Sequence, residues 1–358
     1  MAKTANAQEL QMEKVKAFHQ RVMNDVAGMV SVACGSIGDK LGLYKALAEN
    51  GSMTPKDLAK LTGANERYLL EWLINQAASG YIEYDSASGR FTLPAEHALV
   101  LTNEDHPLFA CGFFQVFSAF SRAVPRISEC FQTGNGMPWG DHDADVFAGT
   151  ERLFRPAYMT QLVPQWIPSI AGLKEKLESG AKVADIGCGH GLSTIIMAKS
   201  FPRSKFFGFD NHAPSIEWAK EESEREGVAD RVQFQVSDAG QFPGEDYDLI
   251  SYFDCLHDMG DPVASCRRAA QALKSNGCAM IIEPMAGNKI EENFNLVGRI
   301  YSGASIMCCT PNAVASGTHS LGTIATDRAL EDVVKAGGFR HFQRSMETPF
   351  NRIFEARL

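Results

Sequence analysis

A glycine-rich run between residues 183 and 191 is the strongest chemical signal in this sequence. It reads Val-Ala-Asp-Ile-Gly-Cys-Gly-His-Gly and brings together Gly187, Gly189 and Gly191. Glycines at a turn between a strand and a helix let the backbone approach a nucleotide closely, and the helix start offers free N–H groups. Dinucleotide-binding chains prefer Gly-x-Gly-x-x-Gly, which fits a pyrophosphate, whereas Asp185 puts a carboxylate beside this turn. The run therefore predicts a nucleotide site for a cationic ligand.

Two further acids follow the next two predicted strands. Asp210 ends one strand, where a carboxylate can accept hydrogen bonds from ribose hydroxyls, and Asp238 ends the next, where it can accept from an adenine amino group. Each acid alone is equally typical of a strand-end cap or a turn. Because open parallel sheets bind ligands at the carboxyl ends of their strands, Asp185 with these two acids predicts an adenosine site.

The predicted elements that position these residues form an α/β domain. From Lys182 onward, short β-rich runs alternate with helices, which is typical of a parallel sheet covered by helices on both faces. The runs are Val183 to Ile186, Phe206 to Asp210, Val232 to Ser237, Tyr247 to Phe253 and Cys278 to Glu283. Two last runs, Phe339 to Ser345 and Arg352 to Arg357, have no helix between them and predict a terminal antiparallel hairpin.

The N-terminal part of the chain is predicted to be mainly helical. Apolar residues at helical spacing predict helices over Gln11 to Ala33 and Gly38 to Glu49. The segment Gly51 to Pro94 then gives two short capped helices and a hairpin, which is the order of a winged helix. This segment carries four basic and five acidic residues, and so lacks the basic face that phosphate contacts require. A dimerisation or scaffolding role is favoured over DNA binding.

With these motifs in place, residues Lys182 to Leu358 resemble the Rossmann-fold S-adenosylmethionine-dependent methyltransferases. Together with the winged-helix segment, the chain is similar to small-molecule O-methyltransferases that dimerise through an N-terminal winged-helix domain. The resemblance implies S-adenosylmethionine as cofactor, with the glycine-rich turn around its methionine moiety, Asp210 on the ribose and Asp238 with Ala239 at the adenine. The residues predicted to bind the cofactor are Asp185, Gly187, Cys188, Gly189, Gly191, Asp210, Asn211, Asp238, Ala239 and Asp254.

The segment Asp254 to Asp261, after the fourth strand, resembles the His-Asp-Trp-Ser-Asp segment of these O-methyltransferases. The resemblance implies that His257 is the general base and that Glu283 is the carboxylate that orients it. An imidazole suits this task because its ordinary pKa of about 6.5 leaves it largely neutral near pH 7. Met259 departs from the pattern, because the family has Trp there. The alternative is that His257 only closes the cofactor pocket.

An aromatic-rich helical region and an uncharged stretch are predicted to enclose the methyl acceptor. Most aromatic residues between Leu108 and Ile170 are expected to form core, and the stretch Ile300 to Thr326 is expected to be an irregular lid. Cys308 and Cys309 within it are expected to be buried thiols, with contact to a soft acceptor as the alternative; His319 is expected to be a loop residue that could add a polar contact. The predicted substrate-binding residues are Phe117, Phe154, Tyr158, Trp166, Arg299 and Tyr301.

Composition limits the remaining possibilities. The 358 residues are 45% hydrophobic and 22% charged, with a formal charge of -9, so no positive field would attract nucleic acid or anionic lipid. Nine cysteines without a Cys-x-x-Cys pair predict reduced thiols and no metal site. The segment Met1 to Phe18 carries Glu9 and Glu13 and lacks an apolar core, so no secretory signal or membrane span is expected and a cytoplasmic location is predicted.

These observations predict an α/β Rossmann-like methyltransferase sheet, parallel with an antiparallel C-terminal hairpin, preceded by a mainly helical winged-helix domain. The predicted boundaries are 1–100 for a winged-helix dimerisation domain, 101–173 for a helical connector contributing to the substrate pocket, and 174–358 for the S-adenosylmethionine-binding domain with a lid near 286–328. The predicted reaction is methyl transfer to an oxygen of a small, fairly apolar acceptor, in a homodimer. The alternatives are a thiol or sulfide acceptor, an N- or C-nucleophile, an S-adenosylmethionine-responsive DNA-binding regulator and a dinucleotide-dependent oxidoreductase.

Overall fold

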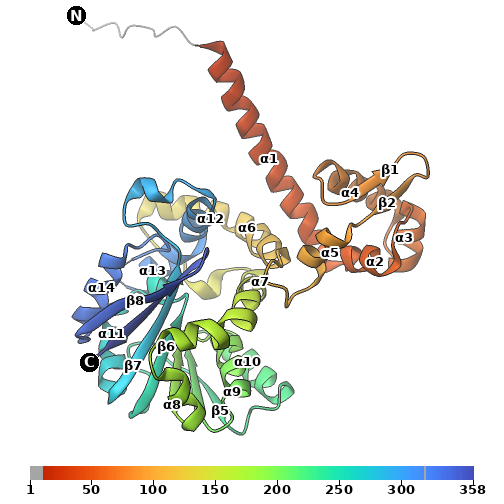
Figure 1. Cartoon of the computed structure of the whole chain (residues 1–358). Coiled ribbons are helices and arrows are strands. Elements are labelled where there is room, and N and C mark those ends of the chain that lie inside the picture. Colours follow the sequence, from red (N-terminus) through yellow and green to blue (C-terminus); the bar gives the residue numbers. More distant parts are fainter. Residues whose placement is uncertain (1–10, 318–319) are drawn as a thin grey trace, which may run out of the picture. The chain divides into compact units, whose positions relative to one another are not determined.

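The computed structural model describes residues 11–317 and 320–358 and divides into two compact units (Figure 1). One unit holds the described residues up to Asn103 together with Phe109–Phe114, and the other holds Glu104–Leu108 with Gln115–Leu358. His319 lies outside the described residues. Within the described residues no single helix has the length and hydrophobicity of a membrane span, although α1 and α2 pass that test together across a 68° bend.

The N-terminal unit is a winged helix preceded by a long helix. Its core consists of side chains such as Leu43, Leu58, Leu73 and Phe91, which the short helices and the hairpin bury among themselves. Thr54 and Asp57 form a reciprocal capping box that starts α3. The elements are α1 (Met12–Lys40), α2 (Leu43–Asn50), α3 (Pro55–Thr62), α4 (Glu66–Ala78), β1 (Glu83–Asp85), β2 (Arg90–Thr92) and α5 (Ala95–Thr102).

One expectation for this unit is wrong, because α1 does not end at Ala33 but continues to Lys40. Gly35 and Gly38 suggest a break in the sequence, yet both lie within the helix. A Cβ at Gly38 would come within 2.4 Å of the Trp72 ring, and one at Gly35 within 2.7 Å of the Phe114 ring. These glycines therefore permit close packing of the helix against aromatic rings.

The larger unit is built on a seven-stranded sheet with the order β5-β4-β3-β6-β7-β9-β8. Strands β5, β4, β3, β6 and β7 are parallel neighbours, and β9 runs antiparallel to both β7 and β8, as the sequence predicts. The strands are β3 (Lys182–Ile186), β4 (Lys205–Asp210), β5 (Val232–Val236), β6 (Tyr247–Phe253), β7 (Leu273–Pro284), β8 (His341–Glu347) and β9 (Asn351–Arg357).

Helices cover both faces of this sheet (Figure 1). Alternate strand residues point to opposite faces, so Val183 belongs to the core under α9 and α10 whereas Ala184 belongs to the core under α11 and α14. The helices of the sheet are α8 (Leu173–Ser179), α9 (Leu192–Ser200), α10 (Ala213–Arg225), η4 (Leu256–Asp258), α11 (Pro262–Ala272) and α14 (Asp327–Ala336).

Two further groups of helices flank the sheet, and each contains a π-helical segment. Before β3 lie α6 (Cys111–Thr133), η1 (Trp139–Asp141), α7 (Ala144–Ala157), the π-helical η2 (Tyr158–Trp166) and η3 (Ile167–Ser169). After β7 lie η5 (Ile290–Asn293), α12 (Leu296–Ala304), the π-helical η6 (Ser305–Cys309) and α13 (Thr310–Ser316). The predicted irregular conformation is therefore wrong over 300–316, where Pro311 is tolerated because it falls near the start of α13, and the role of this stretch as a lid stays a prediction.

Candidate active site

The glycine-rich turn joins β3 to α9 in the way the sequence predicts. Gly187 has φ of 70° and Gly191 has φ of 79°, in the left-handed region that favours glycine. A Cβ at Gly187 would come within 2.8 Å of Cys255 Sγ, and one at Gly191 within 2.5 Å of the Phe234 ring. The turn therefore packs closely against Cys255, which follows β6, and against Phe234 of β5, and its Gly187 N–H donates to the Phe209 carbonyl near the end of β4.

A cavity of about 260 Å³ opens beside this turn, at the carboxyl ends of β3, β4 and β6. Most of the predicted cofactor residues line it, and Asp185 and Gly191 do not. Those in the lining are Gly187, Cys188, Gly189, Asp210, Asn211, Asp238, Ala239 and Asp254.

Asp210, at the end of β4, is held in place by backbone donors. Its Oδ2 accepts from the N–H of Gly189 at 2.9 Å, and its Oδ1 accepts from the N–H of His212 at 2.8 Å. Burial raises the pKa of this carboxyl, and the two backbone bonds oppose that rise. Each oxygen keeps a further lone pair, so the fixed carboxylate can still accept hydrogen bonds from a bound ligand.

Asp185 supports the turn from below. The side chain is fully buried, and its carboxylate accepts bonds from the hydroxyls of Thr194 at 2.6 Å, Ser193 at 2.8 Å and Ser251 at 3.1 Å. Burial raises its pKa to about 6, although the three hydroxyls lower it. In this position Asp185 ties the start of α9 to β6, and its contact with a cofactor stays a prediction.

Asp254, directly after β6, has φ of 51° in the left-handed region, which is uncommon for a residue with a Cβ. Its Oδ1 accepts from Asn351 Nδ2 at 2.8 Å and its Oδ2 from the Tyr158 hydroxyl at 3.4 Å. Burial and the nearby Glu283 raise its pKa to about 8. At neutral pH its carboxyl is therefore mostly protonated, and a cation placed beside it would favour release of that proton.

His257 and Glu283 form a buried pair in which His257 Nδ1 lies 2.7 Å from Glu283 Oε2. Both side chains are buried, and neither belongs to the lining of the cavity. Burial opposes protonation of His257, but the charge of Glu283 and hydrogen bonds with Glu283 and Cys309 raise its pKa well above its ordinary value. The structure thus brings together the two residues that the resemblance implies, and Cys309 also forms a hydrogen bond with the imidazole.

The predicted substrate residues separate into two groups. Phe154 and Tyr158 line the cavity and stack on each other at 5.8 Å between ring centroids. The other four lie outside its lining. Phe117 packs in an aromatic cluster, and Trp166 is fully buried with its ring against the ring of Tyr158. Arg299 is exposed on α12, and the Tyr301 hydroxyl donates a hydrogen bond to the Phe350 carbonyl. Their contact with an acceptor stays a prediction.

Sequence reasoning missed several cavity residues. His190 Nδ1 lies 2.8 Å from Glu151 Oε2, and both residues line the cavity above the turn. Asn312, on α13, accepts from the Trp139 N–H at 2.9 Å and donates to the Asp258 carbonyl at 3.0 Å. No spacing rule links residues so far apart in the chain, so only the folded arrangement could identify them.

The polar side chains that line the cavity fit S-adenosylmethionine. Six acidic side chains line the cavity, and three of them, Asp210, Asp238 and Asp254, suit a ligand that carries hydroxyl, amino and cationic groups, whereas so acidic a lining would repel a polyphosphate. The described residues include no group of three His, Cys, Asp or Glu side chains placed to hold a metal ion. All nine cysteines are free thiols.

The fold and the site have the features of the Rossmann-fold methyltransferases that use S-adenosylmethionine. Residues 177–331 match a protein family described as a methyltransferase domain, and residues 28–103 match one described as an Rv2258c-like winged HTH domain. The chain therefore contains a methyltransferase domain preceded by a winged-HTH domain.

Similar proteins include 27-O-demethylrifamycin SV methyltransferase of Amycolatopsis mediterranei, 29% identical over 141 residues, which are 39% of this chain and 46% of that protein. The matches span 24% to 60% of the length of the first curated relatives. Among solved structures, mitomycin 7-O-methyltransferase is 18% identical with a TM-score of 0.73, covering 97% of this chain and 100% of that one. Human N-acetylserotonin methyltransferase in complex with S-adenosylmethionine is 16% identical with a TM-score of 0.71, covering 99% of both chains. At these identities the two structures show a shared fold.

Proposed function

We propose that this protein transfers a methyl group from S-adenosylmethionine to an oxygen atom of a small, fairly apolar molecule. The observation that carries this proposal is the buried contact of 2.7 Å between His257 Nδ1 and Glu283 Oε2, in a segment whose neighbours Asp254, Cys255 and Asp258 line the cavity. A base held in this way can take a proton from a hydroxyl group. The names of the curated and solved relatives, which include several O-methyltransferases, support the same reaction.

The cavity residues divide the binding of S-adenosylmethionine among them. We assign Asp210 to the ribose hydroxyls, Asp238 and Ala239 to the adenine, and the backbone of Gly187 and Gly189 to the methionine part. When bound, S-adenosylmethionine supplies an electrophilic methyl group on a sulfonium centre. The protein contributes positioning, which alone can lower a barrier by about 7–11 kcal/mol when the reacting atoms are aligned.

His257 then handles the acceptor proton at Nε2, because Nδ1 is engaged by Glu283. The raised pKa makes this imidazole a stronger proton acceptor, and Glu283 stabilises the imidazolium that results. Since the neutral form must be present first, turnover should rise with pH as the imidazolium loses its proton. We expect an acceptor hydroxyl to displace the hydrogen bond between Cys309 and the imidazole.

An aromatic and sulfur-rich cluster next to Cys309 supports an apolar acceptor. Its members pack together from α6, α7 and the π-helical η6 and carry no charge. They include Phe117, Phe120, Trp139, Phe147, Met307 and Cys308. We assign the acceptor to this side of the cavity.

The reaction can be tested by mass spectrometry with methyl-labelled S-adenosylmethionine and pooled phenols, hydroxy acids, thiols and sulfide. Label on an oxygen supports the proposal, whereas label only on sulfur would replace the acceptor class. Binding is tested separately with Asp210→Ala, which should abolish detectable calorimetric affinity for S-adenosylmethionine. Asp230→Ala, an exposed acid paired with Arg231, is the matched control and should bind normally.

We further propose that two copies of the chain pair through the N-terminal winged-helix domain. Large apolar side chains at helical spacing are exposed along α1, among them Phe18, Val22, Val26 and Met29. Such a stripe is typical of a surface covered by a partner helix. Val22→Glu with Val26→Glu should convert a dimer into a monomer in light scattering, and an unchanged mass would refute this interface.

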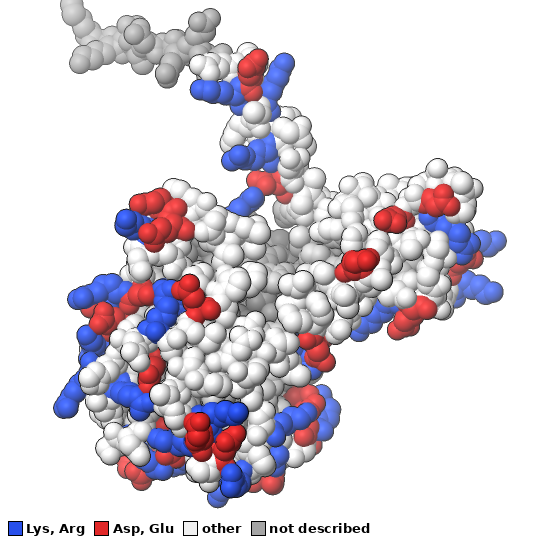
Figure 2. Space-filling view, viewed as in Figure 1, with Lys and Arg blue, Asp and Glu red and all other residues white. Residues whose placement is uncertain are grey.

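The charge distribution does not favour a DNA-binding regulator. On the winged-helix unit Arg67 pairs with Glu71 and Arg90 pairs with Asp57, so these cations are already neutralised. Acidic and basic side chains are interspersed over the visible surface (Figure 2). Phosphate contacts need a continuous basic face, which this arrangement does not supply.

A further inference from the structure

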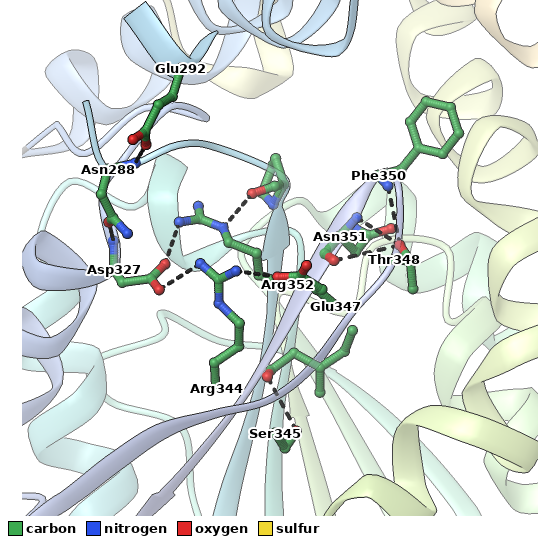
Figure 3. Close-up of polar contacts among 12 residues, drawn as sticks. Asn288, Glu292, Asp327, Arg344, Ser345, Glu347, Thr348, Phe350, Asn351 and Arg352 are labelled. Carbon is green, nitrogen blue, oxygen red and sulfur yellow. Dashed lines mark hydrogen bonds and ion pairs between the residues drawn. The ribbon is translucent and has the colours of Figure 1, made fainter. Parts of the chain in front are cut away.

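Arg352 is a fully buried arginine on β9, opposite Glu283 of β7, which is the partner of the proposed base. It pairs with Glu283 across the antiparallel register of β9 and β7, and its exposed fraction is 0%. Its Nε donates to the Pro284 carbonyl at 2.9 Å, and its Nη1 donates to Asp327 Oδ1 at 2.8 Å (Figure 3). These contacts fix the guanidinium from two sides.

Arg352 and Glu283 each have one side-chain atom without a hydrogen-bond partner in the part of the chain that the structure describes. Among the described residues, Arg352 Nη2 and Glu283 Oε1 are both buried and unbonded. Glu283 uses its other oxygen for His257. The charges of Glu283 and Arg352 favour each other.

We infer that Arg352 is a positioning residue for the methyl-transfer reaction, because its buried positive charge, opposite Glu283 on the neighbouring strand, offsets part of the negative charge that Glu283 presents to His257. This inference rests on the proposed function of His257 as the base. Glu283 alone makes the imidazole hold a proton tightly, which would leave too little of the neutral base near pH 7. The positive charge of Arg352 offsets part of that effect.

A second layer holds Arg352 in place. Asp327, the first residue of α14, also binds Arg344 Nη2 at 2.5 Å, and its N–H donates to Asn288 Oδ1 at 3.0 Å (Figure 3). Arg344 therefore shares the same carboxylate as Arg352 but is not the cross-strand neighbour of Glu283. This difference makes Arg344 a matched control for the charge of Arg352.

Other ionisable groups also act on the His257–Glu283 pair and must stay unchanged in the test. They come from the end of β6, from η4, from α11 and from η6, and their effects are electrostatic or, for Cys309, include a hydrogen bond to His257. They are Asp254, Cys255, Asp258, Cys266 and Cys309.

The experiment follows the imidazole of His257 by nuclear magnetic resonance in histidine-labelled full-length protein. The His257 signal is the one that disappears in His257→Gln. Arg352→Met should raise the pKa of His257 by about one unit, because a cation near the pair is lost. Arg344→Met should leave that pKa unchanged, and Arg352→Lys should restore most of it. If Arg352→Met does not fold, Arg352→Gln serves for the same titration.

An unchanged His257 titration in Arg352→Met or Arg352→Gln would overturn the inference, as would an equal shift in Arg344→Met. The titration needs no methyl acceptor, so it stands even if the proposed reaction is wrong. In the active enzyme, the acid limb of the kcat profile should move upward with the same variant. A His257 shift without that movement would overturn the role of His257 as base and with it the role of Arg352 in turnover.

Discussion

His257 and His142 are both buried in the methyltransferase unit, but their surroundings differ. His257 is 3% exposed and bonds to a carboxylate, whereas His142 is 6% exposed and packs near the rings of Phe120 and Trp139. Neither ring nitrogen of His142 has a hydrogen-bond partner among the described residues. Burial lowers the pKa of His142 despite the nearby Asp141, while the pKa of His257 is raised well above its ordinary value.

The difference shows that burial alone does not make a histidine a base. Loss of water disfavours the imidazolium in both places, and only a neighbouring charge reverses that preference. One buried histidine thus holds a proton strongly and the other stays neutral over the same pH range. The predictions below test whether this contrast in surroundings is also a contrast in function.

Replacing His257 should have the largest effect. We expect His257→Ala to lower kcat by about 10²-fold or more on an acceptor with a hydroxyl group, because general-base assistance is lost. The affinity for S-adenosylmethionine, measured by calorimetry, should remain. His142→Ala is the control and should keep nearly full turnover; equal losses in the two variants would abolish the functional contrast.

Replacing Glu283 should make the surroundings of His257 similar to those of His142. Glu283→Gln removes the charge that favours the imidazolium, so the pKa of His257 should fall and turnover should drop about 10- to 100-fold as the ring loses its orientation. The acid limb of the kcat profile should then move to lower pH. Glu355→Gln, another buried carboxylate on β9, should leave that limb in place.

Asp254 extends the comparison to a buried acid. Burial disfavours the charged form of both groups, so it raises the pKa of Asp254 and lowers the pKa of His142. With a pKa of about 8, Asp254 is mostly protonated at pH 7, and a cationic ligand favours its ionised form. The affinity for S-adenosylmethionine should therefore increase by up to about tenfold per pH unit between pH 6 and 8. Calorimetry in two buffers of different ionisation enthalpy should detect proton release, and Asp254→Asn should reduce it; a flat pH dependence would contradict this prediction.

Replacing His142 should have the smallest effect, and it should be favourable. Because the imidazole is buried without partners, His142→Phe should stabilise the fold by about 1 kcal/mol. The folded-state pKa of His142 is lowered, so wild-type stability should fall as pH drops below about 6.5, and the variant should lose that part of the acid sensitivity. Thermal melts at pH 5.5 and 8 measure both effects; lower stability at pH 8 would mean that the ring has a polar partner.

Much of the fold follows from local patterns in the sequence. Strand β6 was predicted with the bounds that the structure has, because the β-rich run from Tyr247 to Phe253 stands between predicted helices along the chain. The order of motifs also placed Gly187, Asp210 and Asp254 at one edge of the sheet, since parallel strands end on the same side. The prediction of where α1 ends was wrong, because the sequence alone does not distinguish a glycine that permits close packing inside a helix from a glycine that ends one.

The interior of the site depends on contacts that no local pattern encodes. Tyr158 and Asn351 meet at Asp254 although the first lies before the sheet and the second near the end of the chain. The approach of Cys309 to His257 and of Arg352 to Glu283 likewise requires the tertiary fold. Hydrophobic spacing predicts which residues are buried, but the partner of a buried polar group is fixed only by packing.

The π-helical η6 spaces its turns with one residue more than an α-helix would use. Each residue of an α-helix advances the direction of its side chain by about 100°. Deleting one residue from Ser305–Cys309 would thus leave an intact helix while turning Cys309 away from His257. A change in chain length at this place would alter what covers the imidazole without altering the sheet.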